Sequence, residues 1–425
     1  MYGLNQLNTL YRIAVMVLVS SLTGACTTMQ TEEAITADFE RVPPGESVQI
    51  SMIAQQTTEL QDKRIDLPEQ MGELLRGVHP KSHGCVSAEF IVNTDIDAEY
   101  QIGLFSIPGK KYNAQIRFSN ASVKLAHDRE GNKNGSRGMA IKIFDVAGEF
   151  IETDQGRQNQ DFLMINTAEF AFANVRGYGF LTDALHASPQ GTDAGALFGL
   201  VLILAGAKQT PPPFPEPLPE DLDRLKTILA SQNRQLPANF DLQDLKELTA
   251  TLNIVITKIQ TRTVRNPLQV QYFGAAPFLF GADRVMKFSA APETIVDQPD
   301  FDAFPSENYL AEALAQTMQG NSEIVFNFKI QVRDEQDDFG HENELIENAS
   351  TTWDSPEQKE IDAYLDVAKI RIMAPQQTTT DTAKSECEKL AFTPWHSLTA
   401  HQPVGGINRL RRSVYYNSAS HRREN

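Results

Sequence analysis

The chain has 425 residues, 41% of them hydrophobic and 22% charged, which is typical of a globular protein with one large core or two smaller ones. Its 38 Lys and Arg stand against 55 Asp and Glu, so the formal net charge is −17. That charge would repel nucleic-acid phosphates, and basic residues gather only in the last stretch, RLRRSVYY followed by HRREN. We therefore expect no nucleic-acid partner.

The N-terminus has the layout of an export signal. Arg12 precedes the apolar run IAVMVLVSSL, and the small residues TGA come just before Cys26, as in a signal peptide that ends at a lipid-modified cysteine. Bacterial lipoproteins usually carry Leu three residues before that cysteine, where this chain has Thr23, so lipidation stays open. We expect a signal peptide over 1–26, a polar tether over 27–50, and a protein that is exported to the periplasm or anchored to the membrane.

The other two cysteines, Cys85 and Cys387, give no recognisable motif. Three cysteines are too few for a disulfide framework and are wrongly spaced for a zinc site. We therefore expect only peripheral chemistry from Cys85 and Cys387, and the sequence leaves their role open.

From about residue 84 onward the sequence predicts strands. Segments rich in β-branched and aromatic residues alternate with clusters of Gly, Pro, Asn and Asp. The predicted strands are 85–92, 100–107, 112–120, 138–146, 161–167, 268–280, 285–293, 323–333 and 370–375. Most are too close together for helical crossovers, which favours an antiparallel sheet that closes on itself. We predict an α+β fold, with a closed antiparallel β-barrel of about eight strands and helical insertions.

The longest insertion spans about 170–266 and is mainly helical. Its apolar run, 194–208, is shorter than the ~20 residues of a membrane span, which favours a buried or membrane-touching helix. A further helix is predicted over 308–320 and should pack against the barrel. Residues 51–425 would then form one domain.

Three separated segments carry residues that make chemical sense together. RGVHPKSHG places Arg76 three residues before His79, AQIRFSN holds Arg117 and Ser119, and INRLRRSVYYNSASHR lies near the C-terminus. With RGMAIKIFDVAGE between the second and third, they resemble the Arg-x-x-His, Arg-Phe-Ser, Arg-Gly-Phe-Ala-Val-Lys-Phe and Arg-x-x-x-Tyr motifs of haem catalases. The resemblance covers about 75–422 and is strongest to the shorter catalase-like haem proteins.

The resemblance implies a haem (iron protoporphyrin) cofactor. Tyr415 would be the proximal ligand of the haem iron, as in catalases. Arg411, four residues earlier, would lie on the same helix face and favour the ionised phenol. Arg76, Arg117 and Arg422 would bind the propionates, because guanidinium forks suit carboxylates.

On the distal side, the resemblance makes His79 the general base and then the general acid that moves a proton between the two peroxide oxygens. Ser119 would hold one ring nitrogen so that the other faces the iron. His83 competes with His79, but only His79 keeps the Arg-x-x-His spacing.

Catalases also place a carboxamide and an aromatic ring near the haem. The carboxamide would come from GRQNQDFLM, where Gln158 or Asn159 could serve and Asn159 is the shorter, better-fitting amide. Phe170 would stack on the macrocycle or belong to the core.

The leading function is haem-dependent decomposition of hydrogen peroxide or of an organic or lipid hydroperoxide, with the haem held inside the closed sheet. One alternative is a fatty-acid hydroperoxide isomerase or lyase of the allene oxide synthase type, with the apolar run 197–205 lining a lipid channel. Another is a haem-binding lipoprotein without turnover. Cys26 would supply a membrane tether, and an oligomer is compatible with this family.

Overall fold

The structure, a computed structural model, describes residues 36–37, 39–70, 72–123, 125, 127–130, 133–296, 306–320, 322–334, 346–353 and 363–424. The predicted signal peptide and Cys26 lie outside these residues. Helix α2 (Glu46–Arg64) begins within the predicted tether, 27–50. The last five residues of that tether are therefore helical, and Ile50 is buried.

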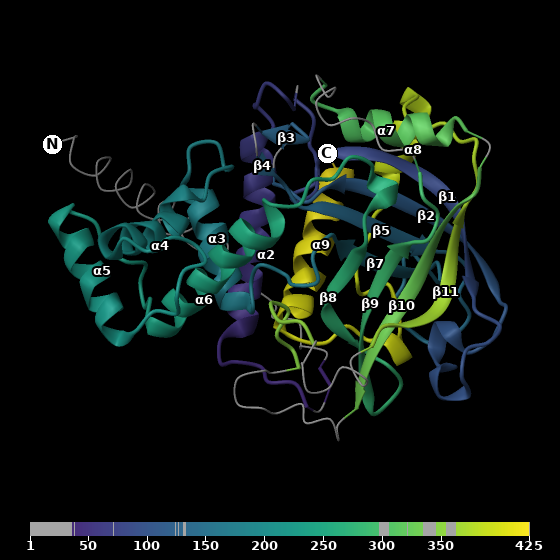
Figure 1. Cartoon of the computed structure of the whole chain (residues 1–425), viewed down its shortest axis with the longest axis horizontal. Helices are drawn as coiled ribbons and strands as arrows, with labels where there is room; N and C mark the ends of the chain where they lie inside the picture. The colour runs from purple at the N-terminus through teal and green to yellow at the C-terminus, as the bar shows by residue number, and fades with distance from the viewer. Residues whose placement is uncertain are drawn as a thin grey trace, which may run out of the picture. The chain divides into compact units, whose positions relative to one another are not determined.

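Eight antiparallel strands close into a barrel in the order β1-β11-β10-β9-β8-β7-β5-β2 (Figure 1). The ring is completed by β1, which pairs with both β2 and β11: Ala88 faces Ala114 on one side and Ile372 on the other. The strands are β1 (Ser82–Val92), β2 (Lys111–Asn120), β5 (Arg137–Ile143), β7 (Gln160–Ile165), β8 (Tyr272–Leu279), β9 (Arg284–Pro292), β10 (Ile324–Asp334) and β11 (Leu365–Ile372). The predicted fold class is confirmed.

Short strands pair outside this ring. They are β3 (Arg129–Glu130) with β4 (Lys133–Asn134), and β6 (Phe150–Glu152) with β12 (Ser397–Leu398).

Aromatic side chains fill the barrel interior. Phe162 of β7 meets Phe328 of β10 with ring centroids 4.8 Å apart, although these strands are not neighbours in the ring. Phe288 of β9 and Phe90 of β1 complete the contact, at 4.8 Å from Phe162 and 5.2 Å from Phe328 respectively. Side chains from different sides of the ring therefore meet in a packed core.

The predicted strand 100–107 is wrong. This segment forms two 3₁₀ turns, η1 (Ala98–Tyr100) and η2 (Gly103–Phe105), whose Leu104 and Phe105 are fully buried in the barrel core. The Leu104 N–H donates to His401 Nε2 at 3.0 Å instead of joining a strand ladder. Gly103 has φ 54°, and a Cβ there would lie 2.4 Å from His401 Nε2, so glycine permits this turn. Apolar content alone could not distinguish this buried turn from a strand.

Four helices and a π turn occupy the predicted insertion. Two begin with side-chain caps: the Asn174 side chain accepts from Gly177 N–H, and Asp241 with Asp244 forms a reciprocal capping box. The four helices are α3 (Val175–Ala187), α4 (Gly195–Lys208), α5 (Pro219–Ser231) and α6 (Leu242–Ile254), and the π turn is η3 (Val255–Ile259).

The apolar run forms α4, which buries Leu200 and Val201 in a core shared with α5 and α6. Across the described ranges, no helix combines the length and apolar character that a membrane crossing requires.

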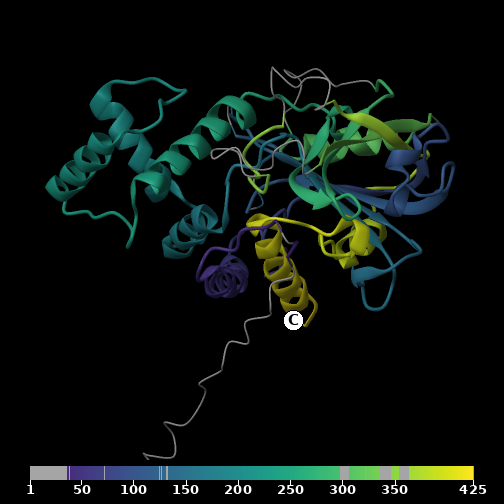
Figure 2. The ribbon, with the colours of Figure 1, turned by 90° about the horizontal axis from the view of Figure 1, so that it is seen from below.

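The C-terminal helix α9 (Gly406–Glu424) packs against α2, as Figures 1 and 2 both show. Its first turn is fixed by buried polar groups. Arg409 donates from Nε to Glu46 Oε1 at 2.6 Å and also pairs with Glu40. Asn408 Nδ2 donates to the Pro277 carbonyl at 2.8 Å, and Trp395 Nε1 donates to the Asn408 carbonyl at 2.8 Å.

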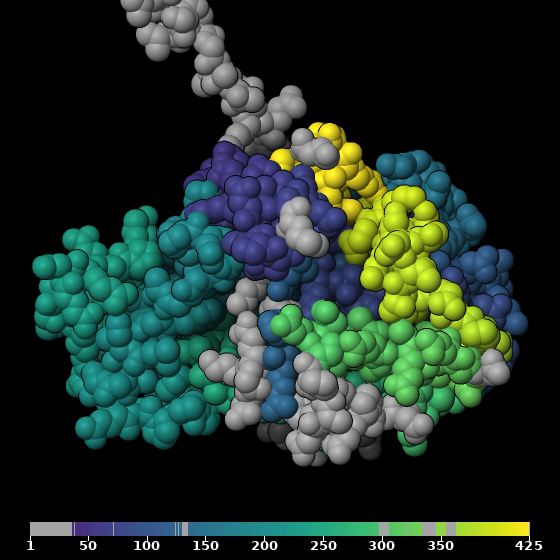
Figure 3. All heavy atoms as spheres, turned by 90° about the horizontal axis from the view of Figure 1, so that it is seen from above, coloured from purple at the N-terminus to yellow at the C-terminus, as the bar shows by residue number. Residues whose placement is uncertain are grey.

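Two further helices, α7 (Tyr309–Met318) and α8 (Asp381–Lys389), pack on β1 and lie side by side on the face shown in Figure 3. The predicted helix 308–320 corresponds to α7. Two short 3₁₀ turns, η4 (Pro267–Gln269) and η7 (Thr399–His401), precede β8 and α9.

We predict that His401 makes the fold sensitive to acid. Burial lowers the pKa of His401 to about 4, so between pH 6.5 and 4 the unfolded chain binds a proton that the folded chain does not. This group should therefore remove about 2 kcal/mol of unfolding free energy between pH 7.5 and pH 5. Urea unfolding at both pH values should show that His401→Gln lacks this part of the pH-dependent loss of unfolding free energy. His186→Gln, at a histidine whose side chain is 42% exposed, is the control, and equal pH dependence of wild type and His401→Gln would contradict the assignment.

Candidate functional site

A cavity of about 320 Å³ lies between the outer face of the barrel and α9. Its volume falls within the ~300–1,000 Å³ of ligand sites. Arg117 and Ser119 of β2 line it, whereas Phe118 between them points into the barrel core. Gly138 and Ala140 of β5 also line it, together with Met139 between them. The expectation that the ligand lies inside the closed sheet is therefore wrong, because aromatic side chains fill that interior.

One face of α9 forms the opposite wall. Ile407, Leu410, Arg411, Val414 and Tyr415 recur at spacings of three and one residues, the periodicity of a single helical face. The next turns continue this wall with Ser418, Ala419 and Arg422. Residues from the start of the barrel and from the end of the chain thus face the same space.

His79 lines this cavity in a fixed, uncommon conformation. Its φ is 59°, in the left-handed region that non-glycine residues seldom adopt. Its backbone N–H donates to the Ser122 carbonyl at 2.8 Å, and its carbonyl accepts from Arg117 Nη2 at 3.1 Å. The ring Nδ1 lies 3.0 Å from Ser119 Oγ, as the sequence predicted for this pair.

Gly138 leaves room for that ring. A Cβ at this position would lie 2.6 Å from His79 Nδ1 and 2.9 Å from Ser119 Oγ. Any side chain would therefore displace one of the two partners.

The surroundings keep His79 neutral. Burial, followed by the positive charges of Arg117, Arg411 and Arg76, lowers the pKa of His79 to about 3. At neutral pH the imidazole is therefore unprotonated, and one of its ring nitrogens carries a lone pair.

Arg411 and Tyr415 meet on α9. The Arg411 guanidinium carbon lies 5.4 Å from the centre of the Tyr415 ring, a cation–π contact, and its Nη1 donates to Asn408 Oδ1 at 3.0 Å. Tyr178 of α3 lines the same cavity, and its pKa is raised to about 12 by burial and by the proximity of Tyr415. Tyr178 therefore stays protonated at neutral pH.

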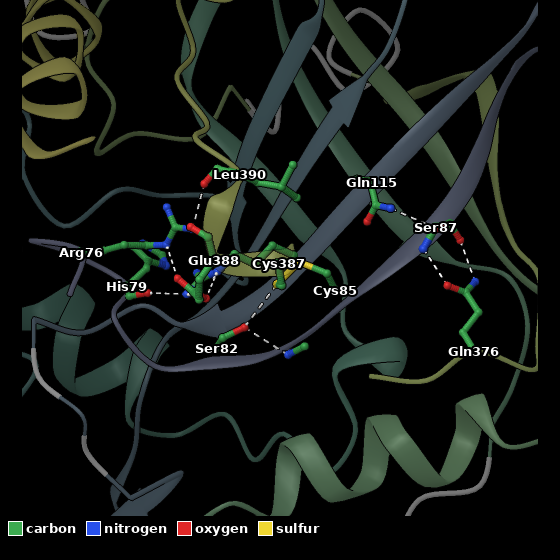
Figure 4. The surroundings of a disulfide bond; sticks show 12 residues. Arg76, His79, Ser82, Cys85, Ser87, Gln115, Gln376, Cys387, Glu388 and Leu390 are labelled. Atoms are coloured by element: carbon green, nitrogen blue, oxygen red, sulfur yellow. Dashed lines mark hydrogen bonds and ion pairs between the residues drawn. A yellow bond between two sulfur atoms is a disulfide. The ribbon is translucent and has the colours of Figure 1, made fainter. Parts of the chain in front are cut away.

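The three arginines predicted to bind propionates all line the cavity and all contact Glu388. Figure 4 shows this glutamate beside Arg76. Arg76 donates from Nε to Glu388 Oε2 at 3.1 Å, and Arg117 donates from Nε and Nη2 to Oε1 at 3.2 and 3.1 Å. Arg422 Nη1 donates to the Glu388 carbonyl at 2.6 Å. Arg76 Nη2 also reaches the Leu390 carbonyl at 2.9 Å.

Charge in this cluster is strongly coupled. Burial and the neighbouring Arg117 lower the pKa of Arg76 to about 9. Burial alone would raise the pKa of Glu388, but Arg117 and Arg76 outweigh it and hold that pKa below its usual range. Glu388 is therefore ionised at neutral pH.

Cys85 of β1 and Cys387 of α8 form a disulfide (Figure 4). The bond joins residues 302 positions apart and attaches Cys387, the residue before Glu388, to β1, a structural role that the sequence left open.

The remaining predicted residues differ in their positions. Phe170 lines the cavity and stacks on Tyr178, with ring centroids 6.3 Å apart. Asn159 is not among the cavity-lining residues: it is 1% exposed, and within the described part of the chain neither its side-chain oxygen nor its nitrogen has a hydrogen-bond partner. Gln158 donates to the Gly148 carbonyl, and His83 lies 3.0 Å from Asn120 Oδ1, both away from the cavity lining.

Sequence reasoning missed Glu388, Tyr178 and Gly138. Glu388 lies in an acidic, lysine-containing helix, and Tyr178 lies in a helix of mixed composition, so neither has a local signal. Gly138 follows Arg137 in a recognised strand, but a glycine reveals nothing of the ring that lies against it.

We predict that Gly138→Ala will break the contact between His79 and Ser119. The added methyl group would overlap the ring, and turnover by any reaction that uses His79 should fall roughly tenfold or more. Imidazole ¹H–¹⁵N spectra would report the ring directly. Gly199→Ala is the control, because a Cβ there meets nothing within 4 Å. Unchanged His79 signals in Gly138→Ala would contradict this geometry.

Comparison with known proteins finds similarity in structure alone. The sequence matches no protein-family model and no curated protein. The structure is similar to a bacterial catalase at 14% identity and TM-score 0.53, covering 92% of this chain and 63% of that one. It is also similar to a fungal catalase (13%, 0.55, covering 82% and 59%) and to catalase A from Saccharomyces cerevisiae (15%, 0.55, covering 92% and 68%).

This chain spans 63% and 59% of the length of the first two catalases. At such identities the likeness is one of fold. The chain therefore has a catalase-like fold, a closed eight-stranded antiparallel barrel with helices.

Proposed function

We propose that this protein is a haem-dependent enzyme that decomposes peroxides. The observation that carries the proposal is that one cavity is lined by His79 on the barrel side and by Tyr415 on α9. The catalase-like fold supports a peroxide-related reaction, and the geometry of the side chains supports the haem.

The residues present fit a haem. Tyr415 would hold the iron, and Phe170 would pack on the macrocycle. Arg76, Arg117 and Arg422 border the same cavity and would bind the propionates. Of the two phenols, Tyr178 is held protonated by its surroundings, which leaves Tyr415 as the candidate iron ligand.

When bound, haem supplies an iron centre that exchanges electrons with the peroxide. The chain itself moves the proton. With hydrogen on Nδ1, the His79 ring donates to Ser119 Oγ and leaves Nε2 as an acceptor for a peroxide proton. Returning that proton to the departing oxygen lets it leave as water or an alcohol, so His79 acts first as a base and then as an acid.

We predict that His79→Ala retains haem but loses turnover by a factor of roughly 10² to 10⁴. Tyr415→Phe should instead change the absorption spectrum of the bound haem, because the phenol oxygen is missing. Tyr416→Phe is the control, since Tyr416 is 71% exposed and lies outside the cavity lining. Full activity in His79→Ala would remove His79 from the mechanism, and an unchanged spectrum in Tyr415→Phe would exclude the proposed ligand.

A second candidate substrate, a fatty-acid hydroperoxide, is favoured by the chemistry of the wall. Among the described residues that line the cavity there is no Asn or Gln, so the predicted distal carboxamide has no representative there. The part of the cavity towards α3 and η3 includes Leu181, Ile259 and Phe273. An apolar wall of this kind accommodates an acyl chain.

We predict that Leu181→Asp distinguishes the two substrates. A carboxylate in the apolar wall should raise KM for a fatty-acid hydroperoxide roughly tenfold or more while leaving hydrogen peroxide turnover nearly unchanged. Oxygen release and loss of each peroxide would be measured. Leu202→Asp, on the exposed side of α4, is the control. Equal KM values for Leu181→Asp and wild type would argue against an acyl chain at this wall.

A further inference from the structure

We propose that Glu388 is a resident carboxylate that competes with the acidic groups of the ligand for the arginine cluster, and that the Cys85–Cys387 disulfide holds it in that position. The inference rests on the proposed haem function and goes beyond it, because it assigns control of ligand affinity to a residue of this chain.

The contacts of Glu388 are those that a ligand carboxylate would make. Its two oxygens accept from different guanidiniums, Oε2 from Arg76 and Oε1 from Arg117. These are charge-assisted hydrogen bonds, the stronger class for such groups. A propionate that approached Arg76 and Arg117 would meet donors that Glu388 already engages.

The position of Glu388 is also that of a competitor. Arg76, Arg117 and Arg422 line the cavity, whereas Glu388 contacts all three and is absent from the described lining. Its side chain is 35% exposed, whereas those of Arg76 and Arg117 are 14% and 4% exposed. The carboxylate can therefore move outward into water while the guanidiniums stay at the cavity.

The disulfide restricts that outward movement. Glu388 directly follows Cys387, which is 3% exposed and bonded to Cys85 in β1 (Figure 4). The end of α8 is therefore covalently attached to the barrel beside the cluster. Glu388 keeps a high local concentration at the arginines for as long as this bond is intact.

Reduction would weaken the competition. A dithiol reductant transfers two electrons and two protons to the bond, leaving two cysteine thiols and the oxidised, disulfide form of the reductant. The end of α8 would then depend on non-covalent contacts alone. The ligand's carboxylates should displace Glu388 more easily in the reduced protein.

Glu388→Gln tests the competition in the full chain. The probes are iron protoporphyrin and its dimethyl ester, in which both propionates are esterified, and the readout is the dissociation constant from absorption titration. Removing the charge should tighten binding of the diacid by roughly tenfold and leave that of the ester unchanged. Glu386→Gln is the matched control, because Glu386 lies on the same helix, is 65% exposed and pairs with Lys389.

The Cys85→Ser/Cys387→Ser double variant tests the tether. It should bind the diacid more tightly than the oxidised wild type and should no longer respond to dithiothreitol. Thermal unfolding of each variant checks that it is folded, and Glu388→Gln keeps both cysteines, so the carboxylate is tested even if the double variant unfolds.

The outcomes separate the two proposals. Unchanged or weaker binding of the diacid to Glu388→Gln would overturn the competition, and so would equal tightening of the diester. Tight binding of both probes to the wild type with no effect of Glu388→Gln would leave the haem function standing and remove this inference alone. If neither probe bound to the wild type or to Glu388→Gln, the haem function would fall, and this inference with it.

Discussion

The position of α9 depends on a buried ion-pair cluster at its first turn. Arg409 is 4% exposed and lies between the carboxylates of Glu40, Glu46 and Glu347. One guanidinium faces three acidic groups, and burial raises the pKa of both Glu40 and Glu347. A buried charge of this kind must be paired, so the helix start is confined to one place. Every cavity residue farther along α9 takes its position from this anchor, because a helix is stiff over four turns.

That anchor gives the cavity its two-sided chemistry. The segment before β1 supplies His79, β2 supplies its partner Ser119, and α9 supplies Arg411 and Tyr415. Neither wall alone brings a neutral imidazole and a phenol to one space. The cationic groups serve both walls, since Arg411 packs on the Tyr415 ring and also contributes to the low pKa of His79. A small change in the angle of α9 would therefore alter both sides together.

Much of the barrel could be predicted from the sequence, because a strand with one buried face repeats every two residues. The same alternation separates Arg117 and Ser119 from Phe118, yet it does not say which face is inside a closed ring. The sequence analysis places the expected haem inside the closed sheet, but aromatic side chains fill that interior. The strand prediction for segment 100–107 was wrong for a related reason: Leu104 and Phe105 are as apolar as strand residues but are buried in a turn.

The candidate site was partly predictable through short motifs, which bring His79, Arg117 and Tyr415 into consideration. What escaped prediction joins distant parts of the chain. Glu388 lies 312 residues from Arg76 and 271 from Arg117, and the two bonded cysteines are 302 residues apart. Contacts at such separations leave no periodic pattern in the sequence. Asn159 is the opposite case. Its segment resembles the one that supplies the catalase carboxamide, but Asn159 is not among the described residues that line the cavity.

The closure of the barrel has a consequence for how the protein is made. Strand β1 leaves the ribosome first among the eight, yet its edge is completed by β11, which is made last. Until residues 365–372 have been synthesised, β1 has a partner strand on one side only. The bond between Cys85 and Cys387 cannot form until Cys387, which follows β11, has also been made. Vectorial synthesis thus leaves one edge of β1 open while residues 93–364 are made, when pairing with another chain would compete with closure.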